Sequence, residues 1–211
     1  MIYKFYQQKV FPHLLNQIMQ VPSMMDSRRR LLLPITGEVL EIGFGTGINL
    51  PFYQQVDQLY ALEPNPDVFR LAQSRIEQSA FHVKHIAAHA ELLPFERGVL
   101  ENIVSTWTLC SVSNVAQVLQ EIYRVLKPGG HFHLVEHVAY DLKQQAGLKR
   151  WQDILTPIQK VIADGCHLNR DIEQALLEAG FHLDHLDYFF AEDLPKVGRR
   201  MLLARVSKPL N

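Results

Sequence analysis

The sequence predicts a doubly wound α/β fold, and three observations support this. After residue 37, short apolar runs alternate with helical stretches. A glycine-rich turn, Gly43 to Gly47, directly follows the first apolar run. Near the end of the chain, two strand-like segments follow each other with no helix between them. Together these observations predict a seven-stranded, mostly parallel, Rossmann-like sheet that ends in an antiparallel β-hairpin.

The first five strands come from short apolar runs separated by helical patterns. We expect a helix after Gly47, and a second helix with Asn65 as its N-cap and Pro66 at its first position. A third helix begins at Ser113 or Asn114 and ends at the turn 127–130. Strand, helix and strand in alternation favour parallel pairing with helices on both faces. The five strands are expected at 39–42, 59–62, 81–87, 100–105 and 131–137.

The last third of the chain departs from this alternation. Helical patterns cover about 142–163 and 171–178, and Gly180 closes the second of them. The segments 183–190 and 200–206 then follow without a helix, so they can pair with each other as antiparallel strands at the sheet edge.

The residues before the first strand form a predicted N-terminal helical cap, 1–36, on the main domain, 37–211. Apolar residues between 2 and 18 recur at helical spacing on one side. We expect this helix to pack on the core or over the active site. The alternative is a helix at a membrane surface, which the scarcity of neighbouring cations disfavours. The run Arg28-Arg29-Arg30 is interpreted as a solvated face.

Composition excludes several classes of protein. The 211 residues carry a formal net charge of -1, which gives no basic field for nucleic acid. No apolar stretch approaches the roughly 18 residues of a membrane span, so only peripheral membrane contact stays open. No secretory signal is present, and two cysteines cannot form a disulfide framework. We therefore expect a cytoplasmic protein without a metal, whose oligomeric state the sequence leaves open.

The glycine-rich turn predicts a nucleoside site at the end of the first strand. Gly43, Gly45 and Gly47 follow the pattern G-x-G-x-G, which lets the backbone approach a ligand closely. A dinucleotide site expects Gly or Ala where Ile48 stands. Glu41 would also repel a pyrophosphate but not a sulfonium or an amino group. The turn therefore favours a cationic nucleoside over NAD.

Glu63 ends the second strand, 20 residues after Gly43. A carboxylate at this place can accept hydrogen bonds from both hydroxyls of a ribose. The alternative is an acidic residue that only stabilises the N-terminus of the helix at Pro66.

Four motifs in order, 41–47, 62–65, 88–95 and 126–130, resemble those of the class I S-adenosylmethionine-dependent methyltransferases. The resemblance implies S-adenosylmethionine as the cofactor and S-adenosylhomocysteine as its product. His89 stands where related enzymes often carry Asp, which leaves the Ala90 backbone and Glu91 to contact adenine. The implied cofactor-binding residues are Glu41, Gly43, Gly45, Gly47, Glu63, Pro64, Asn65, His89, Ala90, Glu91 and Thr106.

The segments 108–112, 135–138 and 164–166 look like the methyltransferase-like group that includes animal thiol S-methyltransferases. This resemblance implies a small-molecule methyl acceptor, and a thiol is the first candidate. A phospholipid amine or another small metabolite is the alternative within the same reaction class. An alternative from another class is an interaction module that binds the cofactor without catalysis. A nicotinamide-dependent oxidoreductase is disfavoured because no Tyr-x-x-x-Lys pair is present.

The acceptor should lie where the fourth and fifth strands end. His137 is the candidate base or orienting group, with a structural histidine as the alternative. Asp164 is the second catalytic candidate, in a loop that could close over the pocket or simply end a helix. Both cysteines are expected to be small buried groups rather than nucleophiles. The predicted substrate-binding residues are Trp107, Leu109, Cys110 and His167, and Trp151 is a further candidate for an apolar wall.

Overall fold

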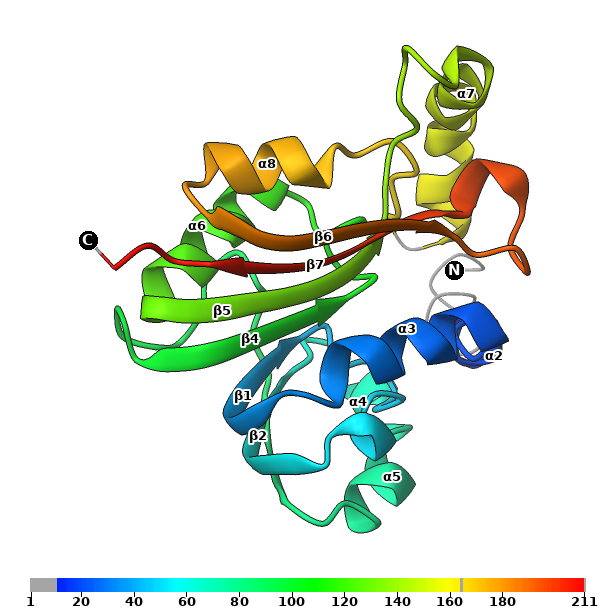
Figure 1. Cartoon of the computed structure of the whole chain (residues 1–211). Coiled ribbons are helices and arrows are strands. Elements are labelled where there is room, and N and C mark those ends of the chain that lie inside the picture. Colours follow the sequence, from blue (N-terminus) through cyan, green and yellow to red (C-terminus); the bar gives the residue numbers. More distant parts are fainter. Residues whose placement is uncertain (1–10, 164, 211) are drawn as a thin grey trace.

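The computed structural model describes residues 11–163 and 165–210 and confirms the predicted fold. Seven strands form one sheet in the order β3-β2-β1-β4-β5-β7-β6 (Figure 1). The strands are β1 Thr36–Ile42, β2 Gln55–Leu62, β3 His82–Ile86, β4 Leu100–Thr106, β5 Leu126–His137, β6 His182–Phe190 and β7 Arg200–Ser207.

The pairing of the strands is parallel on one side of the sheet and antiparallel on the other. β1 pairs in parallel with β2 and β4, β2 pairs with β3, and β4 pairs with β5. β7 runs antiparallel to both β5 and β6. The predicted C-terminal hairpin is therefore confirmed. Its second strand lies between β5 and β6, so that β6 forms the edge.

Helices cover both faces of the sheet, as Figure 1 shows. One buried apolar cluster lies between the sheet and α6, Val115–Val125, and α8, Ile172–Glu178. A second cluster lies on the other face, under α3, Pro22–Leu32. The short helices α4, Pro66–Arg70, and α5, Gln73–Glu77, belong to this second side. The sheet thus has a core on each face.

Side-chain caps begin three of the helices. Asn65 accepts hydrogen bonds from the backbone N–H groups of Asp67 and Val68, and Pro66 occupies the first position of α4. Asn114 caps α6 through the N–H of Gln117, and Asp171 caps α8 in the same way. The predicted caps at Asn65 and Asn114 are confirmed. Each cap satisfies an N–H group that has no partner inside its helix.

The prediction of a helix directly after the glycine-rich turn is wrong. A single 3₁₀ turn, Leu50–Phe52, is found there instead. Residues 48–54 separate Gly47 from the start of β2, and this is too short for two helical turns with their connections. The side chain of Asn49 is also buried and bonded to its surroundings.

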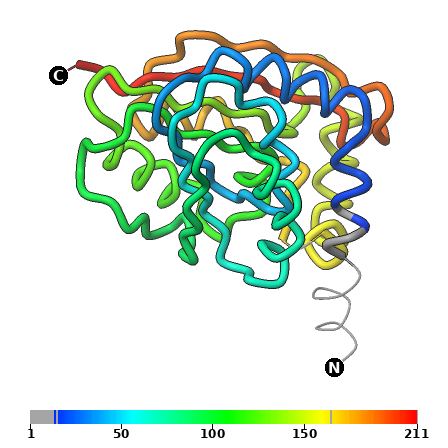
Figure 2. Tube along the Cα trace, turned by 90° about the horizontal axis from the view of Figure 1, so that it is seen from below, coloured from blue at the N-terminus to red at the C-terminus, as the bar shows by residue number. Residues whose placement is uncertain are grey.

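The N-terminal residues form two helices where the structure describes them. α2, Phe11–Ile18, and α3 are followed by β1, and residues 1–10 of the predicted cap lie outside the described part. Figure 2 shows α2 at the end of the molecule opposite the C-terminus. Leu31 and Leu32 of α3 pack in the second core. No helix in residues 11–163 and 165–210 is long and apolar enough to cross a membrane.

The interpretation of the arginine run as a solvated face is wrong for its first member. Arg28 is only 2% exposed, whereas Arg29 and Arg30 are exposed. The Arg28 Nε donates to Asn49 Oδ1 at 2.8 Å, and its Nη1 donates to the Met19 carbonyl at 2.6 Å. Its guanidinium also lies 4.5 Å from the centre of the Trp107 ring. Helical periodicity turns Arg28 toward the sheet while its two neighbours face solvent.

Candidate active site

The glycine-rich turn connects the end of β1 to the 3₁₀ turn and has a left-handed backbone at every glycine. Gly43, Gly45 and Gly47 have φ values of +69°, +60° and +73°. The N–H groups of Gly43 and Phe44 both donate to the Leu62 carbonyl, at 3.0 and 3.1 Å, which ties the turn to the end of β2. Other residues adopt this conformation only at a cost, so the spacing of the glycines follows from the shape of the turn.

Two of these glycines have different neighbours. A Cβ on Gly43 would come within 2.1 Å of the Thr108 hydroxyl, so this glycine allows the turn after β4 to pack closely. A Cβ on Gly45 would meet only the Gly43 carbonyl oxygen, at 3.8 Å. The space beside Gly45 is therefore open, and the cofactor contact expected there stays a prediction.

Glu63 holds the same turn from the end of β2. Its Oε2 accepts a hydrogen bond from the Gly45 N–H at 3.0 Å, and its Oε1 accepts one from the Asn65 N–H at 2.9 Å. These two contacts place the carboxylate between the turn and the start of α4. The predicted ribose contact stays a prediction. The structure adds a second role, since Glu63 also orients the backbone that faces the ligand.

Glu41 lies at the centre of a buried polar network that the sequence did not reveal. It is 1% exposed and accepts hydrogen bonds from Asn49 Nδ2 at 2.9 Å and from the Tyr53 hydroxyl at 2.7 Å. Burial raises the pKa of Glu41 to about 7, although both hydrogen bonds and the nearby Arg28 act in the opposite direction. Asn49 also donates to the Thr106 hydroxyl at 3.0 Å. The network thus joins β1, α3 and the end of β4.

The predicted adenine loop lies between β3 and β4. His89 is exposed and Ala90 is buried. Glu91 is partly buried, and its carboxylate accepts from the Ser113 N–H at 3.0 Å. Its carbonyl accepts from Gln117 Nε2 at 2.9 Å. Pro64, the other exposed candidate, precedes the Asn65 cap at the end of β2. The cofactor contacts of these residues stay predictions.

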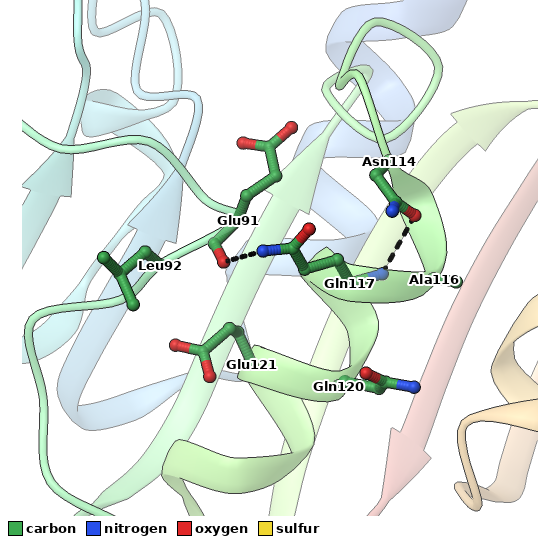
Figure 3. Close-up of a pocket in the computed structure, with 7 residues that line it drawn as sticks. All are labelled: Glu91, Leu92, Asn114, Ala116, Gln117, Gln120 and Glu121. Atoms are coloured by element: carbon green, nitrogen blue, oxygen red, sulfur yellow. Dashed lines mark hydrogen bonds between the residues drawn. The ribbon is translucent and has the colours of Figure 1, made fainter.

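Glu91 also borders a surface depression against α6 (Figure 3). The depression has a volume of about 490 Å³. Carboxylate and amide side chains dominate its lining, and it contains no other predicted cofactor residue. It is lined by Glu91, Leu92, Asn114, Ala116, Gln117, Gln120 and Glu121.

The turn after β4 carries the predicted acceptor residues. Trp107 has φ +52°, a conformation that is uncommon for a bulky residue and that concentrates at functional sites. Its ring is 9% exposed, and its Nε1 lies 3.5 Å from the Met201 sulfur. Leu109 is fully buried in the core, and its substrate contact stays a prediction. Trp151, by contrast, is 56% exposed on α7, Ala146–Ile162, and does not belong to either core.

Glu136 holds this turn in place, a role that the sequence did not predict. Its carboxylate is fully buried and accepts from the N–H groups of Thr108 and Leu109, both at 2.8 Å. A third N–H, that of Cys110, lies 3.4 Å away. Burial raises the pKa of Glu136 even though these donors favour its charged form. An acidic residue at the end of a buried strand is the signal that could have indicated this anchor.

His137, at the end of β5, contacts a sulfur atom. Its Nε2 lies 2.9 Å from Cys166 Sγ, while its Nδ1 is buried without a partner among the described residues. Burial acts to lower the pKa of His137, but the contact with Cys166 and the nearby Glu136 outweigh it and raise this pKa. His167 lies beside them, with its Nδ1 3.2 Å from the Cys110 carbonyl. Asp164, the other catalytic candidate, lies outside the described residues.

The site therefore brings together a close backbone approach at Gly45, a ribose-competent carboxylate at Glu63 and a histidine at the end of β5. These features lie at the carboxyl ends of parallel strands, where open α/β sheets bind ligands. They define a nucleoside-binding protein of the doubly wound class.

Comparison with known proteins agrees with this class. A family model described as a methyltransferase domain matches residues 40–134. The human thiol S-methyltransferase TMT1B is 34% identical over 169 residues, 74% of this chain and 68% of that protein. The chain belongs to the class I S-adenosylmethionine-dependent methyltransferases, and S-adenosylmethionine is its cofactor. The predicted family and cofactor are thus confirmed.

Two further similarities describe how far the likeness extends. The human thiol S-methyltransferase TMT1A is 34% identical over 146 residues, which cover 68% of this chain but 59% of that relative. A crystal structure of an S-adenosylmethionine-dependent methyltransferase from Thermotoga maritima superimposes with a TM-score of 0.68 at 20% identity, over 99% of this chain and 100% of that one. This structural match concerns the fold alone.

Proposed function

We propose that this methyltransferase transfers the methyl group of S-adenosylmethionine to the sulfur of a small thiol. The observation that carries the proposal is the identity of about one third to thiol S-methyltransferases, which extends beyond the cofactor half of the chain. It includes the turn after β4 and the end of β5, where the acceptor is expected.

The proposed reaction needs little covalent chemistry from the protein. S-adenosylmethionine supplies a methyl group on an activated sulfonium leaving group. Gly45 and Glu63 bind and orient the nucleoside, and the strained turn at Trp107 positions the acceptor. Orientation of this kind can supply on the order of 7–11 kcal/mol. A free thiol has a pKa of about 8.5, so modest help produces the thiolate. We propose that His137 accepts or orients the thiol proton in the absence of a metal.

The test is a comparison of acceptors with the purified chain. We would incubate it with S-adenosylmethionine and a small alkyl thiol, a phenol, or vesicles that contain phosphatidylethanolamine, and identify methylated products by mass spectrometry. We expect a thioether to form with the thiol and not with the other acceptors. A methylated amine or phenol without a thioether would point to another acceptor class. Binding of S-adenosylhomocysteine without turnover on any acceptor would indicate an interaction module.

Two further points belong to the same proposal. We propose that residues 1–36 act as a cap on the domain 37–211, because Leu31 and Leu32 of α3 pack in one of the two cores. We also propose a cytoplasmic location with at most peripheral membrane contact, which two unpaired cysteines and a near-neutral net charge support. Cell fractionation tests the location, and stability of the chain truncated before residue 37 tests the cap.

A further inference from the structure

Two cysteines that are 56 positions apart in the sequence meet at the end of β5. Cys110 comes from the turn after β4, Cys166 from the segment that follows α7, and His137 from the end of β5. Their side-chain ligand atoms, two sulfurs and a ring nitrogen, all lie within 4.8 Å of one another. The three residues are 2%, 8% and 8% exposed for Cys110, His137 and Cys166, respectively.

The donor set suits one class of ion. Thiolate and imidazole ligands are preferred by zinc, whereas calcium and magnesium prefer oxygen. In a tetrahedral zinc site, Zn–S bonds of about 2.3 Å and Zn–N bonds of about 2.0–2.1 Å place two sulfurs roughly 3.8 Å apart and a sulfur and a nitrogen roughly 3.6 Å apart. The 2.9 Å contact between His137 and Cys166 must open slightly, and the widest separation in the group, at most 4.8 Å, must close.

The balance of charge also favours a dication at this buried place. A zinc ion with two thiolates and a neutral imidazole has no net charge, so its burial avoids the cost of an isolated ion. The nearest charged groups oppose each other, because the Glu136 carboxylate and the Arg170 guanidinium both act on His137. The Arg170 guanidinium donates to the carbonyls of Leu109 and Val112.

Without a metal, the Cys110 Sγ donates to the Trp107 carbonyl at 3.4 Å, and the Cys166 Sγ contacts His137 Nε2 at 2.9 Å. The neighbouring Cys110 thiol and burial raise the pKa of Cys166 well above its usual value, so the sulfur is a neutral thiol. His137 Nδ1 is buried with no hydrogen-bond partner among the described residues. Zinc would bind through Nε2, the nitrogen that faces Cys166, so Nδ1 would take a partner outside the metal, such as an ordered water.

We propose that Cys110, His137 and Cys166 form a zinc site with one coordination position left for a non-protein ligand. The described residues supply three ligands to the group, and zinc takes four. The proposed zinc site is close to the glycine-rich turn. Thr108, which packs against Gly43, is only two residues before Cys110 in the chain. Zinc would keep His137 as a ligand, and the metal rather than the imidazole would then stabilise a thiolate nearby.

The test uses cobalt(II) as a spectroscopic probe on the full chain after removal of metals with a chelator and reduction with a phosphine. Thiolate ligation gives a charge-transfer band in the near ultraviolet, and tetrahedral cobalt gives visible bands. We expect one cobalt per chain, its displacement by one zinc, and the release of about two protons per zinc at pH 7 as the thiols ionise. Neither S-adenosylmethionine nor an acceptor is present, so failure of the proposed thiol methylation would not affect this result.

The variants Cys110→Ser, Cys166→Ser and His137→Gln each remove one ligand. Loss of an outer-shell partner commonly costs 10–100-fold in metal affinity, so loss of a ligand should cost at least about 100-fold. The matched control is His167→Gln, a histidine beside the cluster whose Nδ1 faces the Cys110 carbonyl, and it should bind as the parent does. Circular dichroism checks that each variant is folded. No charge-transfer band with the parent chain, or an affinity for cobalt that is unchanged in both serine variants, would overturn the proposal.

Discussion

Gly43 and Gly45 have the same left-handed backbone but different surroundings. We expect Gly45→Val to abolish binding of S-adenosylhomocysteine while the sheet stays folded, because its side chain would extend into the open space beside the turn. Gly43→Ala should instead lower the free energy of unfolding, because its Cβ would collide with Thr108. Isothermal titration and urea unfolding measure the two effects. Normal binding by the Gly45 variant would show that the turn is not the cofactor site.

The Glu63 side chain is expected to contribute to ligand binding through its two carboxylate oxygens. We expect Glu63→Ala to weaken binding of S-adenosylhomocysteine by about 1.5–3 kcal/mol, since a hydrogen bond to a charged group is lost. Glu63→Gln keeps one acceptor oxygen but sets its amide NH2 against the N–H of Gly45 or Asn65, so part of the loss should remain. Calorimetric titration measures both. Equal affinity in the parent and the alanine variant would remove Glu63 from the ribose role.

Glu41 should make stability depend on pH. Its pKa is raised by burial from 4.5 to about 7 in the folded chain, so between these values the folded state binds more protons than the unfolded one. The stability from protonated Glu41 is therefore fully present below about pH 4.5 and is lost as the pH rises through about 7. The shift in the pKa of Glu41 corresponds to a change of about 3 kcal/mol in the free energy of unfolding.

Urea unfolding at several pH values tests this expectation. Glu41→Gln imitates the protonated carboxyl and cannot ionise, so it should lose about 3 kcal/mol less than the parent over the same pH range. The comparison cancels the contributions of the other titrating groups. Parallel pH profiles for the two chains would mean that Glu41 is charged across the whole range.

At the scale of elements, α7 is attached by polar groups rather than by its apolar residues. Gln152 is 1% exposed, accepts from the Tyr140 N–H at 2.8 Å and donates to the carbonyls of Val138 and Val197 at 3.1 and 3.0 Å. Apolar side chains on the other side of the helix, such as Ile154 at 60%, are exposed. The hydrogen bonds of Gln152 therefore fix the position of α7.

We expect Gln152→Ala to lower the free energy of unfolding by about 1–3 kcal/mol for each buried group left without a partner. Ile154→Ala on the exposed side should change it by less than about 0.5 kcal/mol. Chemical denaturation of both variants measures the contrast. A larger loss from the isoleucine change than from the glutamine change would mean that the exposed face is covered in solution.

For the molecule as a whole, cofactor binding should raise thermal stability. A ligand at 100 times its dissociation constant stabilises the folded state by about 2.7 kcal/mol. For a chain of 211 residues this corresponds to a shift in melting temperature of roughly 5–11 °C. Differential scanning fluorimetry with S-adenosylhomocysteine should show the shift, and NADH should not. An equal shift with NADH would contradict the assignment of the nucleoside site.

The fold class, the C-terminal hairpin and the glycine-rich turn could be predicted because they depend on local patterns. Each of these patterns involves only a few neighbouring residues. Examples are the apolar runs, the spacing of the glycines, and the caps at Asn65 and Asn114. The helix expected after Gly47 was wrong because the pattern did not show how soon β2 must begin. The burial of Arg28 was missed because three adjacent arginines look alike in the sequence, and only packing on the sheet turns one of them inward.

The sequence by itself determined the doubly wound sheet, its C-terminal hairpin and the place of the glycine-rich turn. Hydrophobic periodicity and backbone preferences depend on residues that are close in the sequence, so a single sequence is enough to recognise them. Only the tertiary structure decided that Glu41 binds Asn49 and Tyr53, that Glu136 holds the turn after β4, and that Cys110, His137 and Cys166 meet. These groups come from separate helices, strands and turns. They become neighbours only when the chain folds, so their spacing in the sequence does not predict the contacts.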